Sequence, residues 1–142
     1  MSIAENTRLV QRAFDSMSAG PDQFLAEHNE IYREDLVAHF PGMPPVTIEM
    51  HRQFGLSTYE AFPDLVRPVE DIVATEDKAV VRWSSEGTHL GPYFGHAPTG
   101  KHLSTTGITI FRIENGKVAE EWIQSDMLGL LQQTGVIPPF ES

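Results

Sequence analysis

The chain has 142 residues, which is enough for one domain with a real core and too few for two, so we expect a single domain over residues 1–142. A net charge of −10 with only ten Lys and Arg residues argues against nucleic acid and anionic membranes as partners. The chain has no cysteine, which excludes disulfides, thiolate nucleophiles and cysteine-based zinc sites. Because the N-terminal residues do not form a secretory signal and no apolar run is long enough for a membrane span, we expect a cytoplasmic protein.

The first half of the chain predicts helices and one short strand. A capping box at Ser2 and Glu5 opens the first helix. Phe24 and Leu25 are the inward-facing residues expected of the second helix, and Pro63 ends the third. The predicted helices run from residue 2 to about residue 20, over residues 22–30 and over residues 47–62, with a strand over residues 35–40.

The second half changes to the alternating pattern of strands. Neighbouring strands are expected over residues 69–75 and 78–86, and residues 87–103 form a long structured excursion rich in Gly, Pro and aromatic residues. A hairpin over residues 105–126 follows, and residues 127–134 form a final short helix. Helices come first and an antiparallel sheet follows, which is an α+β arrangement.

The hairpin turn is predicted at Asn115-Gly116, the dipeptide that favours a two-residue type I′ turn. Counting outward from that turn places Thr105 opposite Asp126. On this register, one face carries Phe111, Glu120, Trp122, Gln124 and Asp126 together with Thr105, Gly107, Thr109 and Val118. The other face carries Ile108, Ile110, Arg112, Ala119, Glu121, Ile123 and Ser125. The first face has the composition of a pocket wall, and the second is apolar enough to predict a homo-oligomer, a dimer or a tetramer.

Five segments of the sequence resemble the SnoaL-like polyketide cyclase family. They are AFPDL at 61–65, VVRW at 80–83, GTHLGPYFGHAPTGK at 87–101, FRIENGKVAEEW at 111–122 and D-x-L-G-L-L-Q-Q at 126–133. The resemblance implies the cone-shaped α+β fold shared with ketosteroid isomerase and nuclear transport factor 2, in which N-terminal helices pack over a curved antiparallel sheet. It is less specific for the reaction, because one fold hosts many functions.

The resemblance also implies a chemistry. Characterised members use an Asp at the position of Asp126 as acid and base in an intramolecular aldol closure of a polyketide ester, without a metal or an organic cofactor. Typical members also place a Gln and a His on the neighbouring strand, where this chain has Gly107 and Thr109. The departure puts the aromatic polyketide substrate in doubt, and it leaves the fold unaffected.

Asp126 has a second interpretation, because it stands just before a short helix and Asp is a preferred N-cap. Glu120 is a further carboxylate on the predicted pocket face, and a solvated residue or a partner for Lys117 is its alternative. His39 ends the first strand and is our candidate for a secondary base or donor at the mouth of the cone, with a structural histidine as the alternative.

The remaining candidates would bind substrate. His89 can order the long excursion or reach the pocket, whereas His28, His51 and His96 are expected at the surface. The residues that can line an apolar cavity, or equally serve as core, include Trp122, Gln124, Thr109, Phe54 and Tyr59. No His, Asp and Glu grouping has the spacing of a metal site.

The leading functional hypothesis is cofactor-independent acid/base chemistry on a small apolar carbonyl compound, with Asp126 moving a proton next to the carbonyl. Aldol cyclisation is the version nearest the family, and isomerisation or hydration would use the same machinery. Two alternatives stay open: a non-catalytic domain that binds a small apolar molecule, and an accessory subunit whose cone is filled by its own side chains.

Overall fold

The computed structural model of the chain describes residues 2–140, and its first helix, α1 (Ile3–Ser18), begins at the predicted capping box. The Ser2 hydroxyl accepts a hydrogen bond from the Glu5 amide at 3.0 Å, and the Ser2 amide donates to the Glu5 carboxylate at 3.4 Å. An apolar stripe that includes Val10 and Phe14 is buried, so α1 lies against the sheet as its sequence pattern predicts.

The second helix, α2 (Pro21–Ile31), begins at its proline and leads directly into the edge strand β1 (Tyr32–His39). Its buried stripe consists of Phe24, His28 and Ile31, whereas Leu25 is 42% exposed. The prediction that Leu25 faces inward is therefore wrong, because the spacing of four and then three residues places His28 on the inner stripe instead. The third helix, α3 (Ile48–Ala61), begins at the N-cap Thr47 and ends before Pro63.

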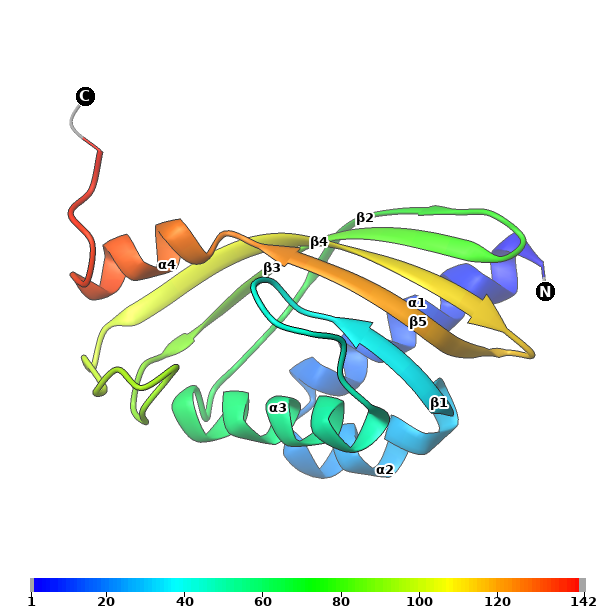
Figure 1. Cartoon of the computed structure of the whole chain (residues 1–142), viewed down its shortest axis with the longest axis horizontal. Coiled ribbons are helices and arrows are strands. Elements are labelled where there is room, and N and C mark those ends of the chain that lie inside the picture. Colours follow the sequence, from blue (N-terminus) through cyan, green and yellow to red (C-terminus); the bar gives the residue numbers. More distant parts are fainter. Residues whose placement is uncertain (1, 141–142) are drawn as a thin grey trace.

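The sheet has the strand order β1-β5-β4-β3-β2. The strands after α3 are β2 (Val69–Ala74), β3 (Lys78–Thr88), β4 (His102–Glu114) and β5 (Lys117–Ser125), and each pairs antiparallel with the next. β1 pairs parallel with β5, so the sheet is mixed and not purely antiparallel as expected. The sheet curves over α1, α2 and α3, and α4 (Met127–Thr134) continues from β5 at the far end (Figure 1). This α+β arrangement confirms the predicted fold class.

The β4–β5 hairpin begins in the predicted register and then departs from it. Glu114 pairs with Lys117 and Ile113 with Val118, but Arg112 pairs with Glu120. One extra residue, Ala119, is therefore accommodated in β5 as a β-bulge. Both bulge residues, Val118 and Ala119, are buried, with exposures of 0% and 4%, which gives the extra residue a place in the core.

The bulge exchanges the two faces of β5 because side chains alternate with a period of two. Beyond it, Glu121 and Ile123 lie on the inner face, and Glu120, Trp122 and Gln124 lie on the outer face. Asp126 donates its amide hydrogen to Thr106 at 2.9 Å, so the predicted pairing of Asp126 with Thr105 is wrong by one residue. No helix within residues 2–140 is long and apolar enough to cross a membrane.

Candidate active site

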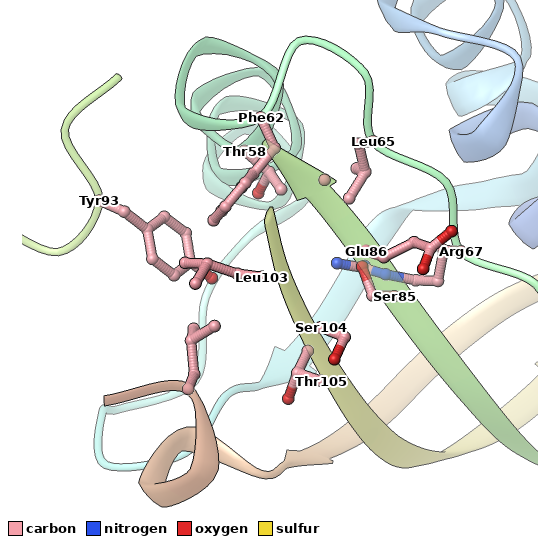
Figure 2. Close-up of a pocket in the computed structure, with 12 residues that line it drawn as sticks. Thr58, Phe62, Leu65, Arg67, Ser85, Glu86, Tyr93, Leu103, Ser104 and Thr105 are labelled. Carbon is pink, nitrogen blue, oxygen red and sulfur yellow. The ribbon is translucent and has the colours of Figure 1, made fainter. Parts of the chain in front are cut away.

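A small cavity of about 30 Å³ lies between α3, the beginning of β4, and α4. Its apolar wall includes Phe62, Leu65, Leu103 and Leu130, and its polar groups include Arg67, Ser85 and Thr105 (Figure 2). A water molecule needs roughly 10–15 Å³ by this measure, so the cavity has room for about two waters. The interior is therefore mostly filled by the protein's own side chains.

Arg67 is the cation of this interior. It stands in an extended segment that runs along β3, since Val66 exchanges two backbone hydrogen bonds with Glu86, both of 3.0 Å. Side chains alternate along such a segment, so Arg67 points inward. Its guanidinium carbon lies 4.7 Å from the centre of the Trp83 ring. Burial lowers the pKa of Arg67, because a charged group loses its hydration there.

A line of three ionisable side chains in the interior connects α2 and α3 to β5. Glu121 Oε1 is in ion-pair contact with His51 Nε2 at 2.5 Å, and His51 Nδ1 lies 2.8 Å from His28 Nε2. All three residues are buried, with exposures of 2%, 8% and 1%. The two histidine rings are within hydrogen-bond distance of each other, whereas Glu121 Oε1 makes no hydrogen bond within residues 2–140 despite its short distance to His51. Within residues 2–140, no three His, Asp or Glu side chains converge as metal ligands.

Burial determines the charge of His28, which is the residue at one end of this line. Burial, followed by the charge of His51, lowers the pKa of His28 to about 3, so His28 is neutral near pH 7. His28 Nδ1 is buried without a partner in the described structure. His28 Nε2 shares a hydrogen bond with His51 Nδ1. Tyr32 lies beside these groups, and burial, followed by the charge of Glu121, raises its pKa.

Trp83 lies against positions 107 and 109, where the family resemblance implies other residues. Its indole Nε1 donates a hydrogen bond to Thr109 Oγ1 at 2.9 Å. A Cβ at Gly107 would lie 2.2 Å from Trp83 Cζ2, so the indole occupies the space that a side chain at position 107 would take. The expected substrate-binding residue Thr109 is thus inside the cone, but its hydroxyl is engaged by Trp83.

Asp126 is the N-cap of α4 in the structure. Its carboxylate accepts a hydrogen bond from the Gly129 amide at 2.8 Å, and the residue is exposed. A Cβ at Gly129 would lie 2.2 Å from Asp126 Oδ2, so a larger residue there would have to displace this carboxylate from the cap. Thr105, which lines the cavity, donates its hydroxyl to the Asp126 carbonyl at 3.2 Å. Asp126 therefore stands beside the cavity, with its carboxylate committed to the helix.

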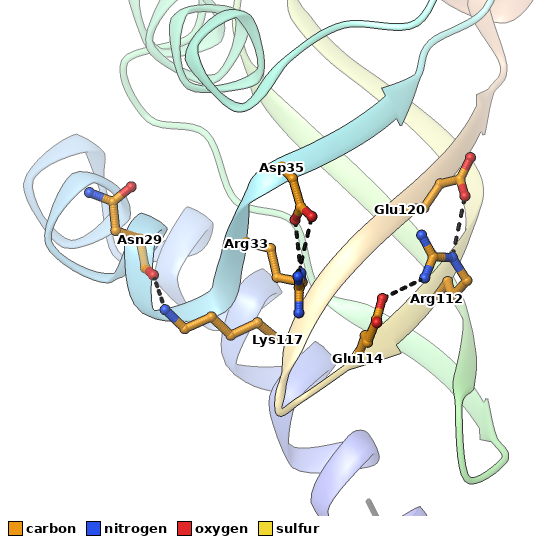
Figure 3. A network of polar contacts seen from close by, with 7 residues as sticks. All are labelled: Asn29, Arg33, Asp35, Arg112, Glu114, Lys117 and Glu120. Atoms are coloured by element: carbon orange, nitrogen blue, oxygen red, sulfur yellow. Dashed lines mark hydrogen bonds and ion pairs between the residues drawn. The ribbon is translucent and has the colours of Figure 1, made fainter.

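Three of the predicted site residues lie on the outer face of the sheet. His39 Nε2 contacts Glu120 Oε2 at 2.7 Å, and its ring stacks on Trp122 with 5.4 Å between the ring centres. Arg112 lies between Glu114 and Glu120, at 3.0 and 3.3 Å (Figure 3). Gln124 is also exposed on this face. The predicted placement of these three in the pocket is wrong, because the bulge turns Trp122 and Gln124 of β5 outward, and His39 of β1 pairs with Trp122 and shares its face.

The other predicted residues serve the packing of the cone. Phe54 packs edge-on against Phe40 at 5.2 Å. The Tyr59 hydroxyl donates to the Met17 carbonyl at 2.5 Å, and burial raises its pKa to about 12. His89 accepts from the Thr99 amide at 3.2 Å and stacks on Phe62, which orders the excursion after β3.

The prediction that His28 and His51 are surface residues is wrong. A pattern in the sequence could have shown this, because His51, Gly55 and Tyr59 recur at intervals of four on α3 and are all buried. No comparable signal marked Glu121 or Arg67. Glu121 depends on the bulge, and Arg67 lies in a connection whose direction is set by tertiary pairing with β3.

The sequence from residue 8 to residue 134 matches the model of the SnoaL-like polyketide cyclase family. The chain belongs to this family. No protein of curated function matches it.

Solved structures agree with this SnoaL-like assignment. AclR from Streptomyces galilaeus, a proposed hydroxylase, superposes with a TM-score of 0.87 and 27% identity, covering 99% of this chain and 87% of that one. A proposed SnoaL-like polyketide cyclase from Jannaschia sp. CCS1 gives 0.86 and 26%, covering 95% and 94%. IdmH from Streptomyces antibioticus, a proposed polyketide cyclase, gives 0.81 and 27%, covering 92% and 98%.

Proposed function

We propose that this SnoaL-like protein is a cofactor-independent acid/base enzyme that moves protons on a small carbonyl compound inside the cone, with intramolecular aldol closure as its reaction. The observation that carries the proposal is the buried contact of 2.5 Å between Glu121 and His51. A carboxylate and an imidazole in direct contact in an apolar interior are suited to take up and return a proton. Family membership supports the reaction class.

The reaction needs one proton carrier. The base removes a proton from the carbon next to a carbonyl group, which leaves an enolate. The enolate carbon attacks a second carbonyl of the same molecule, so that one carbon–carbon bond forms and the attacked oxygen becomes an alkoxide. The protonated base returns its proton to that oxygen. His28 extends the pair, because its Nε2 lies 2.8 Å from His51 Nδ1 and can hold the orientation of that ring.

Two carboxylates compete for the role of base. The family resemblance assigns it to Asp126, which stands beside the cavity but is exposed and bound to the Gly129 amide. Glu121 is buried, and its carboxylate contacts the imidazole of His51. We favour the pair of Glu121 and His51, since both side chains lie inside the cone, whereas the carboxylate of Asp126 is exposed and bound to the helix that it caps.

The test uses a linear diketone whose two carbonyls are separated by three methylene groups, which closes to a six-membered ring by an aldol reaction. We expect Glu121→Gln to lower the rate of closure by about 10²–10⁴-fold. Glu120→Gln is the matched control, because Glu120 is the preceding residue of the same strand and lies on the outer face. Its rate should stay at that of the unmodified protein.

Asp126→Asn is the competing arm, because Asn keeps the helix cap and removes the basicity. A large loss of rate in Asp126→Asn with full activity in Glu121→Gln would move the base to Asp126 and keep the reaction class. Full activity in both variants would overturn the proposed function. Exchange of the diketone's α-protons with heavy water, followed by NMR, reports the first step separately from ring closure.

The small size of the cavity favours a second candidate function, a non-catalytic member of the fold whose cone is filled. About 30 Å³ is far below the 300–1,000 Å³ that is typical of small-molecule sites. Catalysis on a molecule larger than a few atoms therefore requires the surrounding side chains or the excursion after β3 to move. If the protein catalyses no α-proton exchange in the diketone or in smaller ketones, the result would support the non-catalytic function.

We also propose a homo-oligomer formed through the outer face of the sheet. Val37, Ile108 and Ile110 lie there with exposures of 37–48%, whereas Ile123 and Glu121, which we had expected on that face, are inside. Apolar groups of this extent favour contact with a second copy. Sedimentation of the protein as a monomer at micromolar concentration would contradict this expectation, and Ile110→Glu should dissociate the oligomer.

A further inference from the structure

Arg67 carries a positive charge in the cone without a neutralising partner. Its Nε is buried and makes no hydrogen bond within the described residues 2–140, and its Nη1 contacts only the Met17 sulfur, at 3.6 Å. The face of Trp83 attracts a cation but cannot neutralise it. No ion pair joins Arg67 to a carboxylate in the described part of the chain.

Two carboxylates in the surroundings of Arg67 have other partners. Glu121 contacts His51 at 2.5 Å, and Glu86 lines the cavity but contacts His102 at 3.4 Å, with 54% of its side chain exposed. A buried charge without a counter-ion lowers the stability of a fold, and a buried donor without an acceptor does the same. Arg67 therefore lies in a position where an anion from outside the chain would be favourable.

The space beside Arg67 fits a small anionic head group. The cavity has room for about two water-sized atoms, and the hydroxyl-bearing residues Ser85 and Thr105 line it with the guanidinium. Phe62 and Leu103 line the opposite wall, where the apolar part of a molecule would lie (Figure 2). A planar guanidinium matches two conjugated oxygens with two parallel hydrogen bonds.

We propose that Arg67 binds an anionic pair of oxygen atoms in the substrate, a carboxylate or a delocalised enolate, within the cavity lined by Ser85 and Thr105. The substrate class narrows from a neutral apolar carbonyl compound to one with such a group. The turnover part of this inference rests on the proposed function, and the binding part does not. An enolate held here would be stabilised as it forms, which lowers the barrier to proton removal.

Binding has a built-in reporter, since Arg67 lies over Trp83. The chain has two tryptophans, so a Trp122→Phe background leaves the emission of Trp83 alone. Acetate and acetamide form the probe pair, because they have nearly the same shape and differ in charge. We expect a saturable change in emission with acetate and none with acetamide.

Variants then assign the charge. Arg67→Met should weaken acetate binding by roughly tenfold to a hundredfold, as expected for loss of hydrogen bonds to a charged group. Arg67→Lys keeps the charge but cannot form two parallel hydrogen bonds, so its affinity for acetate should lie between those of the parent and Arg67→Met. Arg82→Met is the matched control, since Arg82 is next to Trp83 on β3 and is exposed on the outer face, and it should bind as the parent does.

A cyclic β-diketone, titrated at pH values above and below its own pKa, distinguishes the two anions. Binding of acetate supports a carboxylate, and binding of only the ionised diketone supports an enolate. Equal responses to acetate and acetamide in the parent, or unchanged acetate binding in Arg67→Met, would overturn the inference. Glu121→Gln should keep acetate binding, so a failure of the proposed proton transfer is distinguishable from a failure of this site.

Discussion

Two consecutive glutamates of β5 each contact a histidine, but in different surroundings. Glu120 contacts His39 on the outer face, where the side chains are 23% and 31% exposed. Glu121 contacts His51 inside the cone, where the side chains are 3% and 9% exposed. The two pairs have the same chemistry and nearly the same distance, 2.7 and 2.5 Å, so their differences report the environment.

The comparison shows that a bulge decides which pair lies inside the cone. On an unbroken hairpin Glu120 would face the interior and Glu121 the outside, and the residue Ala119 reverses this. The outer pair is hydrated and shares Arg112, whereas the inner pair continues only to His28. Charge interactions are strong and hard to screen inside, and weak and easily screened outside.

The largest expected effect is on stability. His51→Ala leaves the carboxylate of Glu121 buried without a partner, and breaking a buried pair in this way typically costs about 3–5 kcal/mol. His39→Ala removes one of two partners of a carboxylate near the surface, because Arg112 still contacts Glu120, and about 0–1 kcal/mol is typical of such pairs. Urea unfolding followed by circular dichroism measures both free energies. Equal losses in the two variants would show that the interior does not distinguish the pairs.

The next largest effect concerns the inner face of β4 at Gly107, where the backbone lies against Trp83. Gly107→Ala would place a Cβ 2.2 Å from Trp83 Cζ2 and 2.7 Å from the Gln124 carbonyl oxygen. Neither the indole nor the backbone can move without disturbing the sheet, so we expect a loss of about 1–3 kcal/mol, as is typical of overpacking. Ser104→Ala is the control, because Ser104 lies on the outer face of the same strand and is exposed. Thermal unfolding of both variants compares the two faces.

Much of this fold follows from local signals in the sequence. Ser2 and Glu5 form the predicted capping box, Asn115-Gly116 forms the predicted turn, and Asp126 forms the cap that was one of its two interpretations. Each of these depends on residues within about four positions of one another. Such short-range contacts can be predicted from sequence, because the backbone geometry that they need is nearly independent of the rest of the chain.

The interior of the candidate site could not be predicted in the same way. The alternation of β5 is correct on each side of the bulge, but no residue type near Ala119 marks the shift between them. The predicted interior positions of Trp122 and Gln124 rested on that unbroken alternation, and both residues lie on the outer face. Arg67 points inward because Val66 pairs with Glu86, a contact between residues twenty positions apart. Sites of this kind depend on strand register, which local patterns leave open.

A smaller effect separates the two pairs by pH. The pKa of His28 is about 3 in the folded protein and 6.5 when unperturbed, so the unfolded chain binds a proton that the folded chain does not. The contribution of His28 to stability is fully present above pH 6.5 and should fall as the pH drops toward 3. The hydrogen bond from His39, the largest cause, lowers the pKa of Glu120 from 4.5, so the outer pair loses its contribution only below that pH.

Unfolding free energies measured between pH 6.5 and pH 4.5 therefore report the titration of His28 separately from that of Glu120. His28→Gln keeps an amide that can donate to His51 and removes the titration, so the slope of stability against pH should flatten in this window. His102→Gln is the control, since His102 is exposed at the surface and should leave the slope unchanged. An unchanged slope in His28→Gln would assign the pH dependence to other groups.

The smallest effect concerns salt. A double-mutant cycle of His39→Ala and Glu120→Gln measures the coupling of the outer pair, which should be about 0.2–1 kcal/mol at low salt. At ~1 M salt the screening length falls to ~3 Å, so this coupling should largely disappear. The same cycle on His51 and Glu121 should change little, because counter-ions cannot enter an interior where both side chains are less than a tenth exposed. A salt-sensitive inner pair would mean that solvent reaches Glu121, and the cone would then be more open than its cavity of about 30 Å³ indicates.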